Sequence, residues 1–346
     1  MKRPNDFNGD LRSDVFWETA SGALAVWTMD NGNQIVAADY VRLGQVITGK
    51  PGSDWHLVGT DAMPADFDGD GKGDLLWWTD SGAVAIWRMN GSQIAGADYL
   101  HLGANIVGRP APDWHIIDIG DFNGDTKADI LWQTDGGALA IWQMDGTQIT
   151  AADYIRLGAN AVGRPGADWH VLGVADFDGD EKGDLLWQTD GGALAIWTMD
   201  GTHIKSADYL RLGSNQVGRP APNWHVAGLG DFDGDGKADL LWHTDANGAV
   251  AFWEMDGTHI KAASYMTFGA ASRTQIPDPD WRVAQVGHFG GDGNADILWR
   301  EANGELDVFE MNGFMLAQPG RVSIGQNPVN VPAPDWTIVA HQYDLL

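Results

Sequence analysis

Residues 176–187 read Asp176-Phe177-Asp178-Gly179-Asp180-Glu181-Lys182-Gly183-Asp184-Leu185-Leu186-Trp187. Carboxylates at positions 1, 3, 5 and 9 of this stretch lead directly into an apolar run that is typical of a β-strand. The pattern returns along the chain, and its position 1 is occupied by Asp6, Asp66, Asp121, Asp176, Asp231 and, in the sixth copy, His288. The spacings of 60, 55, 55, 55 and 57 residues indicate a tandem repeat.

Each copy predicts four strands and no helix. In the copy at 169–224 the expected strands are 169–174, 185–187, 193–199 and 204–212. The loop at 213–222 then crosses to the next copy, and no segment has the 3.6-residue period of a helix. Four strands in about 55 residues describe a propeller blade. The sequence therefore predicts an all-β fold, a six-bladed β-propeller of four-stranded blades.

The two ends of the chain predict how the ring closes. The chain begins inside a blade at residues 5–7, and it finishes with a lone first strand at 335–342. We expect this C-terminal strand to pair with the second strand of the N-terminal blade, which leaves no unpaired edge. Residues 1–346 then form a single domain, with repeats that start near 6, 66, 121, 176, 231 and 288.

Composition narrows the classes of partner. The chain has 48 acidic and 21 basic side chains and a formal net charge of −27, which argues against a nucleic acid or an anionic membrane surface. It has no cysteine, so disulfides and thiolate metal sites are excluded. No apolar stretch is long enough for a membrane span, and no signal peptide is recognisable at Met1-Lys2-Arg3-Pro4.

The acidic loops predict calcium sites. Carboxylates at positions 1, 3, 5 and 9, with the carbonyl of position 7, supply the hard oxygen ligands that Ca²⁺ prefers. An EF-hand is excluded because it needs flanking helices and a glutamate at position 12. The expected ligands are Asp6, Asn8, Asp10, Arg12 and Asp14; Asp66, Asp68, Asp70, Lys72 and Asp74; Asp121, Asn123, Asp125, Lys127 and Asp129; Asp176, Asp178, Asp180, Lys182 and Asp184; and Asp231, Asp233, Asp235, Lys237 and Asp239. We expect about five Ca²⁺ ions, with the loop at 288–296 empty.

The alternative for these loops is that they are acidic turns without metal. Four like charges within nine residues repel one another unless they are neutralised, which favours the metal. Five Ca²⁺ ions would change the formal charge from −27 to −17, so metal should also contribute to stability. Position 6 favours glycine but is Leu11, Thr126 or Glu181 in three loops, so we expect the affinity to differ between loops.

The stretch at 176–187 resembles the FG-GAP/VCBS repeat, and the resemblance covers essentially the whole chain. That repeat forms the propeller of integrin α-subunits and of many secreted bacterial proteins. The resemblance implies calcium between the first two strands, a secreted or cell-surface location, and a role in adhesion or carbohydrate recognition. The blade plan is also similar to that of fungal lectins of the Psathyrella velutina type, which have seven blades, so their sugar specificity does not carry over.

A candidate ligand site repeats on the face opposite the metal loops. The alternation of strands places the crossing loop there, and three copies carry Asn105, Arg109, Trp114 and His115; Asn160, Arg164, Trp169 and His170; and Asn215, Arg219, Trp224 and His225. An aromatic ring with planar hydrogen-bonding groups suits a sugar. The same tryptophans equally suit packing between blades, and the histidines suit strand positions that pair with backbone.

Repetition favours binding over catalysis. No nucleophile with a base and an orienting partner stands out, so we do not expect an enzyme. Repeated weak sites are how a multivalent carbohydrate-binding protein gains avidity, which favours glycans or glycoconjugates as partners. The alternatives are an adhesion module of the integrin kind that grips one cell-surface protein, and a purely structural segment of a larger surface protein.

Overall fold

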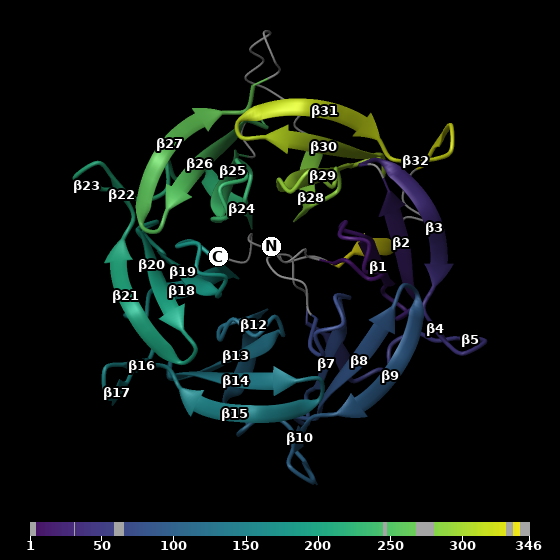
Figure 1. Cartoon of the computed structure of the whole chain (residues 1–346), viewed down its shortest axis with the longest axis horizontal. Helices are drawn as coiled ribbons and strands as arrows, with labels where there is room; N and C mark the ends of the chain where they lie inside the picture. Colours follow the sequence, from purple (N-terminus) through teal and green to yellow (C-terminus); the bar gives the residue numbers. More distant parts are fainter. Residues whose placement is uncertain are drawn as a thin grey trace.

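A computed structural model describes residues 5–30, 32–58, 66–244, 248–267, 280–329 and 335–339. These residues form strands and no helix, and the strands build six sheets around a central axis (Figure 1). Each sheet is one blade, numbered here in chain order. The predicted all-β, six-bladed propeller is confirmed.

The main strands follow the repeat. Blade 1 contains β1 (Val15–Thr19), β2 (Leu24–Asp30) and β3 (Gln34–Tyr40). The other blades each contain four: β6 (Trp55–Leu57), β7 (Leu75–Thr79), β8 (Val84–Asn90) and β9 (Gln93–Tyr99); β12 (Trp114–Gly120), β13 (Asp129–Thr134), β14 (Leu139–Asp145) and β15 (Gln148–Tyr154); β18 (Trp169–Ala175), β19 (Asp184–Thr189), β20 (Leu194–Asp200) and β21 (His203–Tyr209); β24 (Trp224–Gly230), β25 (Asp239–Thr244), β26 (Val250–Asp256) and β27 (His259–Tyr265); and β28 (Trp281–Gly287), β29 (Asp296–Glu301), β30 (Leu306–Asn312) and β31 (Met315–Arg321).

The first strand of each blade lies nearest the axis and the fourth lies outermost. The strand order in blade 3 is β12, β13, β14, β15, and the first strands β12, β18, β24 and β28 contact their neighbours around the axis. Figure 1 shows β15, β21 and β27 on the outer wall. The loop between the first and second strands, which carries the acidic motif, therefore lies close to the axis at one end of the ring.

In the described residues a short hairpin follows the fourth strand of blades 1, 2, 3, 4 and 6 and extends the outer edge of the next blade around the ring. The hairpin strands are β4 (Arg42–Leu43), β5 (Val46–Ile47), β10 (His101–Leu102), β11 (Asn105–Ile106), β16 (Arg156–Leu157), β17 (Asn160–Ala161), β22 (Arg211–Leu212), β23 (Asn215–Gln216), β32 (Ser323–Ile324) and β33 (Asn327–Pro328). In each hairpin the first strand pairs in parallel with the fourth strand of the next blade, as Arg211 does with His259. These hairpins project from the rim in Figure 1.

The hairpins correct the prediction of the fourth strand. The strand expected at 204–212 ends at Tyr209, and Arg211 and Leu212 belong to the sheet of blade 5. The break occurs because the Leu210 side chain is fully buried while its amide donates to the carbonyl of Leu194, so the chain turns there. The crossing loop expected at 213–222 likewise contains β23.

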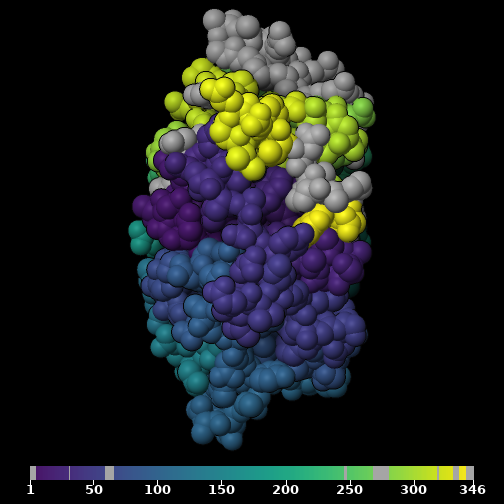
Figure 2. Space-filling model, turned by 90° about the vertical axis from the view of Figure 1, so that its right-hand side faces the viewer, coloured from purple at the N-terminus to yellow at the C-terminus, as the bar shows by residue number. Residues whose placement is uncertain are grey.

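The ends of the chain close the ring within blade 1, as predicted. Strand β34 (Trp336–Ile338) pairs antiparallel with β1, with Trp17 opposite Ile338. On the outer edge β32 pairs with β3, with Gln34 opposite Ser323. In the side view of Figure 2 the purple N-terminal and yellow C-terminal segments lie together on the same wall. Residues 340–342 of the predicted closing strand lie outside the described residues.

The hydrophobic core lies between adjacent blades. Each of six apolar clusters combines side chains of two neighbours, such as Leu186 of blade 4 with Trp242 of blade 5. The second strands contribute a fully buried tryptophan in every blade: Trp17, Trp77, Trp132, Trp187, Trp242 and Trp299. The predicted core roles of Trp132 and Trp142 are confirmed, since the rings are 4.9 Å apart and at most 9% exposed.

None of the described segments is a helix that could cross a membrane.

Candidate functional site: acidic loops and the crossing-loop face

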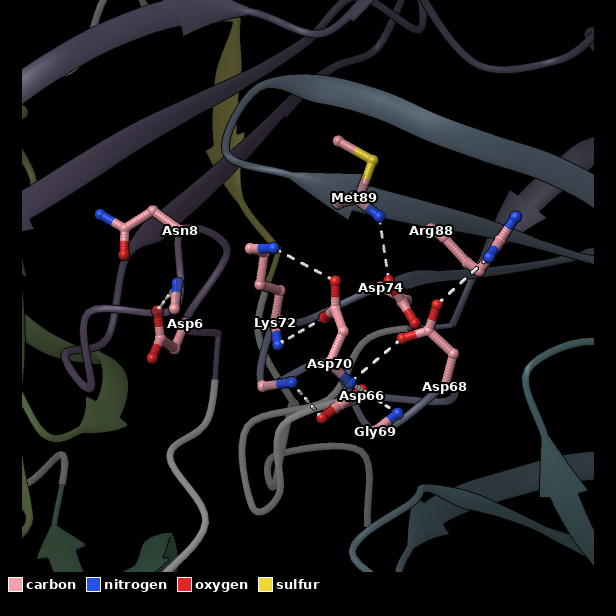
Figure 3. Close-up of polar contacts among 12 residues, drawn as sticks. Asp6, Asn8, Asp66, Asp68, Gly69, Asp70, Lys72, Asp74, Arg88 and Met89 are labelled. Atoms are coloured by element: carbon pink, nitrogen blue, oxygen red, sulfur yellow. Dashed lines mark hydrogen bonds and ion pairs between the residues drawn. The ribbon is translucent and has the colours of Figure 1, made fainter.

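The carboxylate at position 1 organises each acidic loop. In the loop at 66–74, Asp66 Oδ1 accepts hydrogen bonds from the amides of Gly69 at 2.7 Å and Asp70 at 3.2 Å, and Oδ2 accepts one from Gly71 at 2.9 Å (Figure 3). The loop can wrap around one side chain because positions 4 and 6 have positive φ, +77° at Gly69 and +83° at Gly71.

The three loops without glycine at position 6 keep the same backbone. Leu11, Thr126 and Glu181 have φ of 71°, 74° and 66°. Their amides still donate to the position 1 carboxylate, at 2.8, 2.9 and 2.7 Å. These residues therefore carry backbone strain, since a left-handed conformation costs a non-glycine residue about 1–2 kcal/mol.

The carboxylate at position 9 ties the loop to the third strand. Asp74 accepts hydrogen bonds from the amide of Phe67 at 3.0 Å and from that of Met89 at 2.9 Å (Figure 3). Burial raises its pKa to about 8, against the effect of these two amides. The equivalent pairs of bonds are made by Asp14, Asp129, Asp184 and Asp239. This structural role was not predicted from the sequence.

Carboxylates converge in three of the loops. Within each of three groups the oxygens lie within 4.8 Å of one another: Asp66, Asp68 and Asp70; Asp176, Asp178 and Asp184; and Asp231, Asp233 and Asp239. Each group contains the carboxylates of positions 1 and 3 and a third carboxylate from position 5 or position 9. None of the three groups therefore contains all four of the carboxylates predicted as ligands. The loops at 6–14 and 121–129 have Asn8 and Asn123 at position 3 and present fewer carboxylates.

The chemistry of these groups fits a hard divalent cation. Every ligand atom is a carboxylate oxygen, a set that suits Ca²⁺ better than zinc or copper. Burial raises the pKa of the position 1 carboxyls of Asp6, Asp66, Asp176 and Asp231. A bound cation would stabilise their ionised form and so offset the effect of burial.

The basic residue at position 7 pairs with the hairpin between the third and fourth strands. Lys127 contacts Asp145 at 2.6 Å and Lys182 contacts Asp200 at 2.5 Å, and Arg12–Asp30 and Lys237–Asp256 are equivalent. Blade 2 has Asn90 in the hairpin, and there Lys72 turns back to Asp70 at 3.2 Å. The acidic loop and the hairpin thus share one face.

The acidic loops also join each blade to the next. The amide at position 8 donates to the position 1 carbonyl of the preceding blade in six bonds: Gly73 to Asp6, Ala128 to Asp66, Gly183 to Asp121, Ala238 to Asp176, Ala295 to Asp231 and Ser13 to His288. A hairpin glycine donates to the position 2 carbonyl of the preceding blade in six more, as Gly146 does to Phe67 at 2.7 Å. Any ion held by a loop therefore lies against an interface between blades.

The sixth loop is built differently. His288 replaces the aspartate of position 1, and its Nδ1 lies 2.8 Å from the carbonyl oxygen of Asn294 at position 7. Asp296 accepts from the amide of Gly290 rather than from that of position 2. No cluster of three acidic or histidine ligands occurs in this loop, all of which is described.

The axial end of the ring is hollowed between the loops. A cavity of about 410 Å³ has Asp121, Asp176 and Asp231 at its rim and apolar side chains such as Leu229 and Val286 in its wall. The position 1 residues of four neighbouring loops, His288 of the sixth loop included, thus border one cavity.

On the opposite face, the crossing loop packs against a turn of its own blade. Arg109 donates through Nη2 to the carbonyl of Asp80 at 2.7 Å, and its side chain covers Gly82. Arg109, Trp114 and His115 line one cavity of about 50 Å³. Asn105 lies in hairpin strand β11 and does not line it. Three members of this predicted set therefore come together and the fourth does not.

The other two copies of the set are placed similarly. Arg164 covers Gly137 and Arg219 covers Gly192. Asn160 and Asn215 begin hairpin strands β17 and β23. The arginines, not the asparagines, therefore lie against the blade turns.

The repeated histidines pair with side chains. His115 Nε2 lies 2.8 Å from Asp135 Oδ1, and His170 makes the same contact with Asp190. The expectation that these rings pair with backbone is wrong for both, because the turn between the second and third strands presents an aspartate beside them.

Five of the boundary tryptophans pack at a tilt against exposed tyrosines. Trp114 is 8% exposed and lies 5.8 Å from the ring of Tyr154, which is 46% exposed. The equivalent pairs are Trp55–Tyr99, Trp169–Tyr209, Trp224–Tyr265 and Trp336–Tyr40. The accessible ring of each pair is the tyrosine, which sequence reasoning missed. The signal was present in Tyr40, Tyr99, Tyr154 and Tyr209, each of which follows an Ala-Asp pair.

Tyr99 and Arg109 border a larger open groove. It has a volume of about 520 Å³, and Ile106, Pro110 and Pro112 complete its wall. The groove lies at the turn and crossing loop of blade 2, so a predicted arginine and an unpredicted tyrosine meet in one site.

Comparisons with known proteins agree with this architecture. Residues 66–132, 121–187, 176–242 and 231–299 match the family model of the FG-GAP-like repeat. No curated protein matches the chain. A solved structure of an Agrocybe aegerita lectin, described as recognising non-reducing terminal N-acetylglucosamine, aligns with a TM-score of 0.56 and 16% identity over 94% of this chain and 80% of the lectin.

A second similar structure belongs to a much larger assembly. The Photorhabdus luminescens Tc holotoxin pore aligns with a TM-score of 0.54 and 16% identity, over 91% of this chain and 14% of the toxin chain. At these identities both structures show the fold alone.

Proposed function

Because the chain belongs to the FG-GAP-like repeat family, we propose that it is a calcium-binding, multivalent carbohydrate-binding protein. Calcium is held by the acidic loops at one end of the ring, and glycans bind in shallow grooves on the crossing-loop face. The observation that carries the glycan proposal is the exposed tyrosine beside the crossing-loop arginine, together with the repetition of that tyrosine around the ring.

The calcium proposal is supported by the converging carboxylates. Five loops carry the motif, and we propose about five ions, with the loop at 288–296 left without one. Exposed loops of this kind suit the millimolar calcium outside cells. We therefore propose a secreted or cell-surface location.

The groove of blade 2 has the chemistry of a sugar site. Tyr99 is 42% exposed, so one face of its ring is free to stack on the C–H surface of a pyranose. Trp55 backs that ring at 6.0 Å and so holds it in place. The guanidinium of Arg109 and the hydroxyl of Ser81 lie in the same wall and can hydrogen-bond sugar hydroxyls.

Repetition supports binding of a multivalent ligand. Five tyrosines between 38% and 49% exposed recur around the ring: Tyr40, Tyr99, Tyr154, Tyr209 and Tyr265. Grooves of this kind bind weakly one at a time, and a branched or clustered glycan would engage several at once. The proposal includes no catalytic activity, because the candidate groups are copied around the ring rather than gathered in one asymmetric site.

A glycan array on the whole protein tests the proposal. We expect binding to a defined family of sugars in millimolar calcium, and a weaker signal after chelation. Replacing the five exposed tyrosines by alanine should abolish the signal, whereas replacing them by phenylalanine should retain most of it, because stacking survives.

Two outcomes would count against the glycan role. A blank array would remove it and favour the adhesion module that grips a single macromolecular partner. Equal binding by the alanine and phenylalanine variants would place the sugar away from the tyrosines.

A further inference from the structure

The fourth strand of every blade carries a one-residue bulge opposite the third strand. In blade 4 the register passes from Thr198–Ser206 to Met199–Ile204, which leaves Lys205 unpaired. The bulge residue of each blade in turn is Val36, Ala95, Thr150, Lys205, Lys261 and Ala317. A bulge re-aims the side chain of its extra residue, and here that side chain lies on the face of the acidic loops.

Two of the six bulge residues are lysines, and both reach into an acidic loop. Lys205 Nζ lies 2.9 Å from Asp178 Oδ2 and 2.7 Å from Asp180 Oδ2. In blade 5, Lys261 Nζ lies 3.0 Å from Asp233 Oδ2 and 2.5 Å from Asp235 Oδ2. Each ammonium thus bridges the carboxylates of positions 3 and 5.

The other blades lack such a bridge from the bulge. Thr150 of blade 3 donates its hydroxyl to the carbonyl of Gln143, and Val36 and Ala95 offer no charge. In blade 2 a different residue, Arg88 of the third strand, contacts Asp68 at 3.3 Å without reaching Asp70. The five acidic loops therefore differ in which basic side chain, if any, contacts their position 3 and position 5 carboxylates.

We propose that Lys205 and Lys261 are tethered counter-cations that compete with calcium for the loops at 176–184 and 231–239. The ammonium neutralises two of the carboxylates that a divalent ion would contact, so calcium must displace it. These two loops then keep their shape without metal and bind calcium more weakly than the same loop with an uncharged bulge residue. The inference rests on the proposal that the acidic loops bind calcium.

The positions of the lysines argue that they act on the metal and not on the fold. The side chains of Lys205 and Lys261 are 41% and 37% exposed, so the ion pairs by themselves contribute little to stability. In blade 4 the lysine contacts the Oδ2 atoms of positions 3 and 5, whereas the loop amides donate to the Oδ1 atoms of those two residues and to the carboxylates of positions 1 and 9. Removing a lysine therefore leaves the hydrogen bonds of its loop intact.

Calorimetric titration of the metal-free chain with CaCl₂ alone tests the inference. Lys205→Met keeps the aliphatic stem and removes the charge, and we expect the affinity of one site to rise roughly tenfold, equivalent to about 1.4 kcal/mol. The control is Lys50→Met, which removes the same charge on the opposite face and should leave every site unchanged. Thr150→Lys should weaken the site at 121–129 by a smaller factor, because Asn123 at position 3 leaves only Asp125 at position 5 for the new ammonium to neutralise.

The outcomes separate the inference from the calcium proposal. Stronger binding in Lys205→Met together with weaker binding in Thr150→Lys supports it. If Lys205→Met does not fold, Thr150→Lys with Thr150→Met as its control decides alone. Calcium binding that is the same in all variants overturns the inference and leaves the calcium proposal standing, whereas no calcium binding in any protein overturns both.

Discussion

His288 Nδ1 lies 2.8 Å from the carbonyl oxygen of Asn294, and because a carbonyl only accepts, the imidazole is the donor. This carbonyl is at position 7, the position whose carbonyl is predicted to be a calcium ligand in the other loops. His288 is 5% exposed, and its backbone amide donates a hydrogen bond to the hydroxyl oxygen of Ser13 at 2.9 Å. The sixth loop thus holds its shape with a side chain where the others have carboxylates.

His288→Ala should destabilise the ring without changing calcium stoichiometry. The half-buried carbonyl of Asn294 would lose its donor, and loss of a buried partner typically costs about 1–3 kcal/mol, so we expect a value near the lower end. Urea unfolding measures the loss, and calorimetric titration counts the ions. A drop in the number of calcium ions would show that this loop does bind metal.

Asp74→Asn should destabilise the protein in the presence of a chelator. The carboxylate accepts from two buried amides, and an amide side chain can accept on one side only, so we expect a loss of about 1–3 kcal/mol. The control is Asp70→Asn at exposed position 5, which should change stability by less than about 0.5 kcal/mol. If urea unfolding showed the same loss of unfolding free energy for Asp74→Asn and Asp70→Asn, the structural role of position 9 would be wrong.

Exchanging residues at position 6 should move stability in opposite directions. Thr126 has φ of 74°, so Thr126→Gly relieves backbone strain in the folded state but also increases the conformational entropy of the unfolded chain. The net effect should stabilise the protein by up to about 1 kcal/mol. Gly71→Thr in blade 2 should destabilise by a similar amount. Melting temperatures of the two variants in chelator check this, and shifts of the same sign would contradict it.

Asp118 should make stability depend on pH. Burial raises its pKa to about 7, although the amides of Ile119 and Val174 lower it. Between about pH 4 and pH 7 the folded state then keeps a proton that the unfolded chain has lost, so stability falls as pH rises through this window. The slope is at most about 1.4 kcal/mol per pH unit.

Asp118→Asn isolates that contribution. Burial also raises the pKa of the position 9 aspartates, so wild type and variant must be compared across the same series. We expect the variant to lose stability less steeply between pH 4 and pH 7. Parallel curves would show that Asp118 stays ionised in the folded protein.

Chelation should lower the melting temperature. A site filled at a hundred times its Kd stabilises the folded state by about 2.7 kcal/mol, and each acidic loop is bonded to the next blade. Scanning calorimetry with and without chelator measures the difference. An unchanged melt would remove the structural role of calcium.

The fold could be predicted because the same strand and loop pattern occurs six times in the sequence. A spacing near 55 residues, a strand on each side of the loop at 176–184, and a lone strand around Trp336 were enough for the blade count and the closure. The end of the fourth strand was predicted too late in the chain because Tyr209, Leu210 and Arg211 continue the alternation of polar and apolar residues without a visible break. Only pairing with the next sheet distinguishes them.

The candidate site was less predictable, since it depends on contacts between distant residues. The acidic motif located the loops, but not the amide of Met89 that binds Asp74 from 15 positions away. Trp114 looked like a ligand platform, and the structure buries it behind Tyr154. The reach of Lys205 follows from a bulge, which leaves no signature in a single sequence.

At five joints in the described part of the chain, a hairpin from one repeat pairs with the sheet of the next, so the covalent repeat and the blade do not coincide. Strand β22 pairs with β27, and the last such hairpin, β32 and β33, returns to β3. A unit bounded by two such joints could therefore be duplicated or lost in the gene without leaving an unmatched edge, because the same parallel pairing is made at all five. The number of repeats that can close a ring then depends mainly on the angle between neighbouring blades around the axis. It depends little on the hairpins that join one blade to the next.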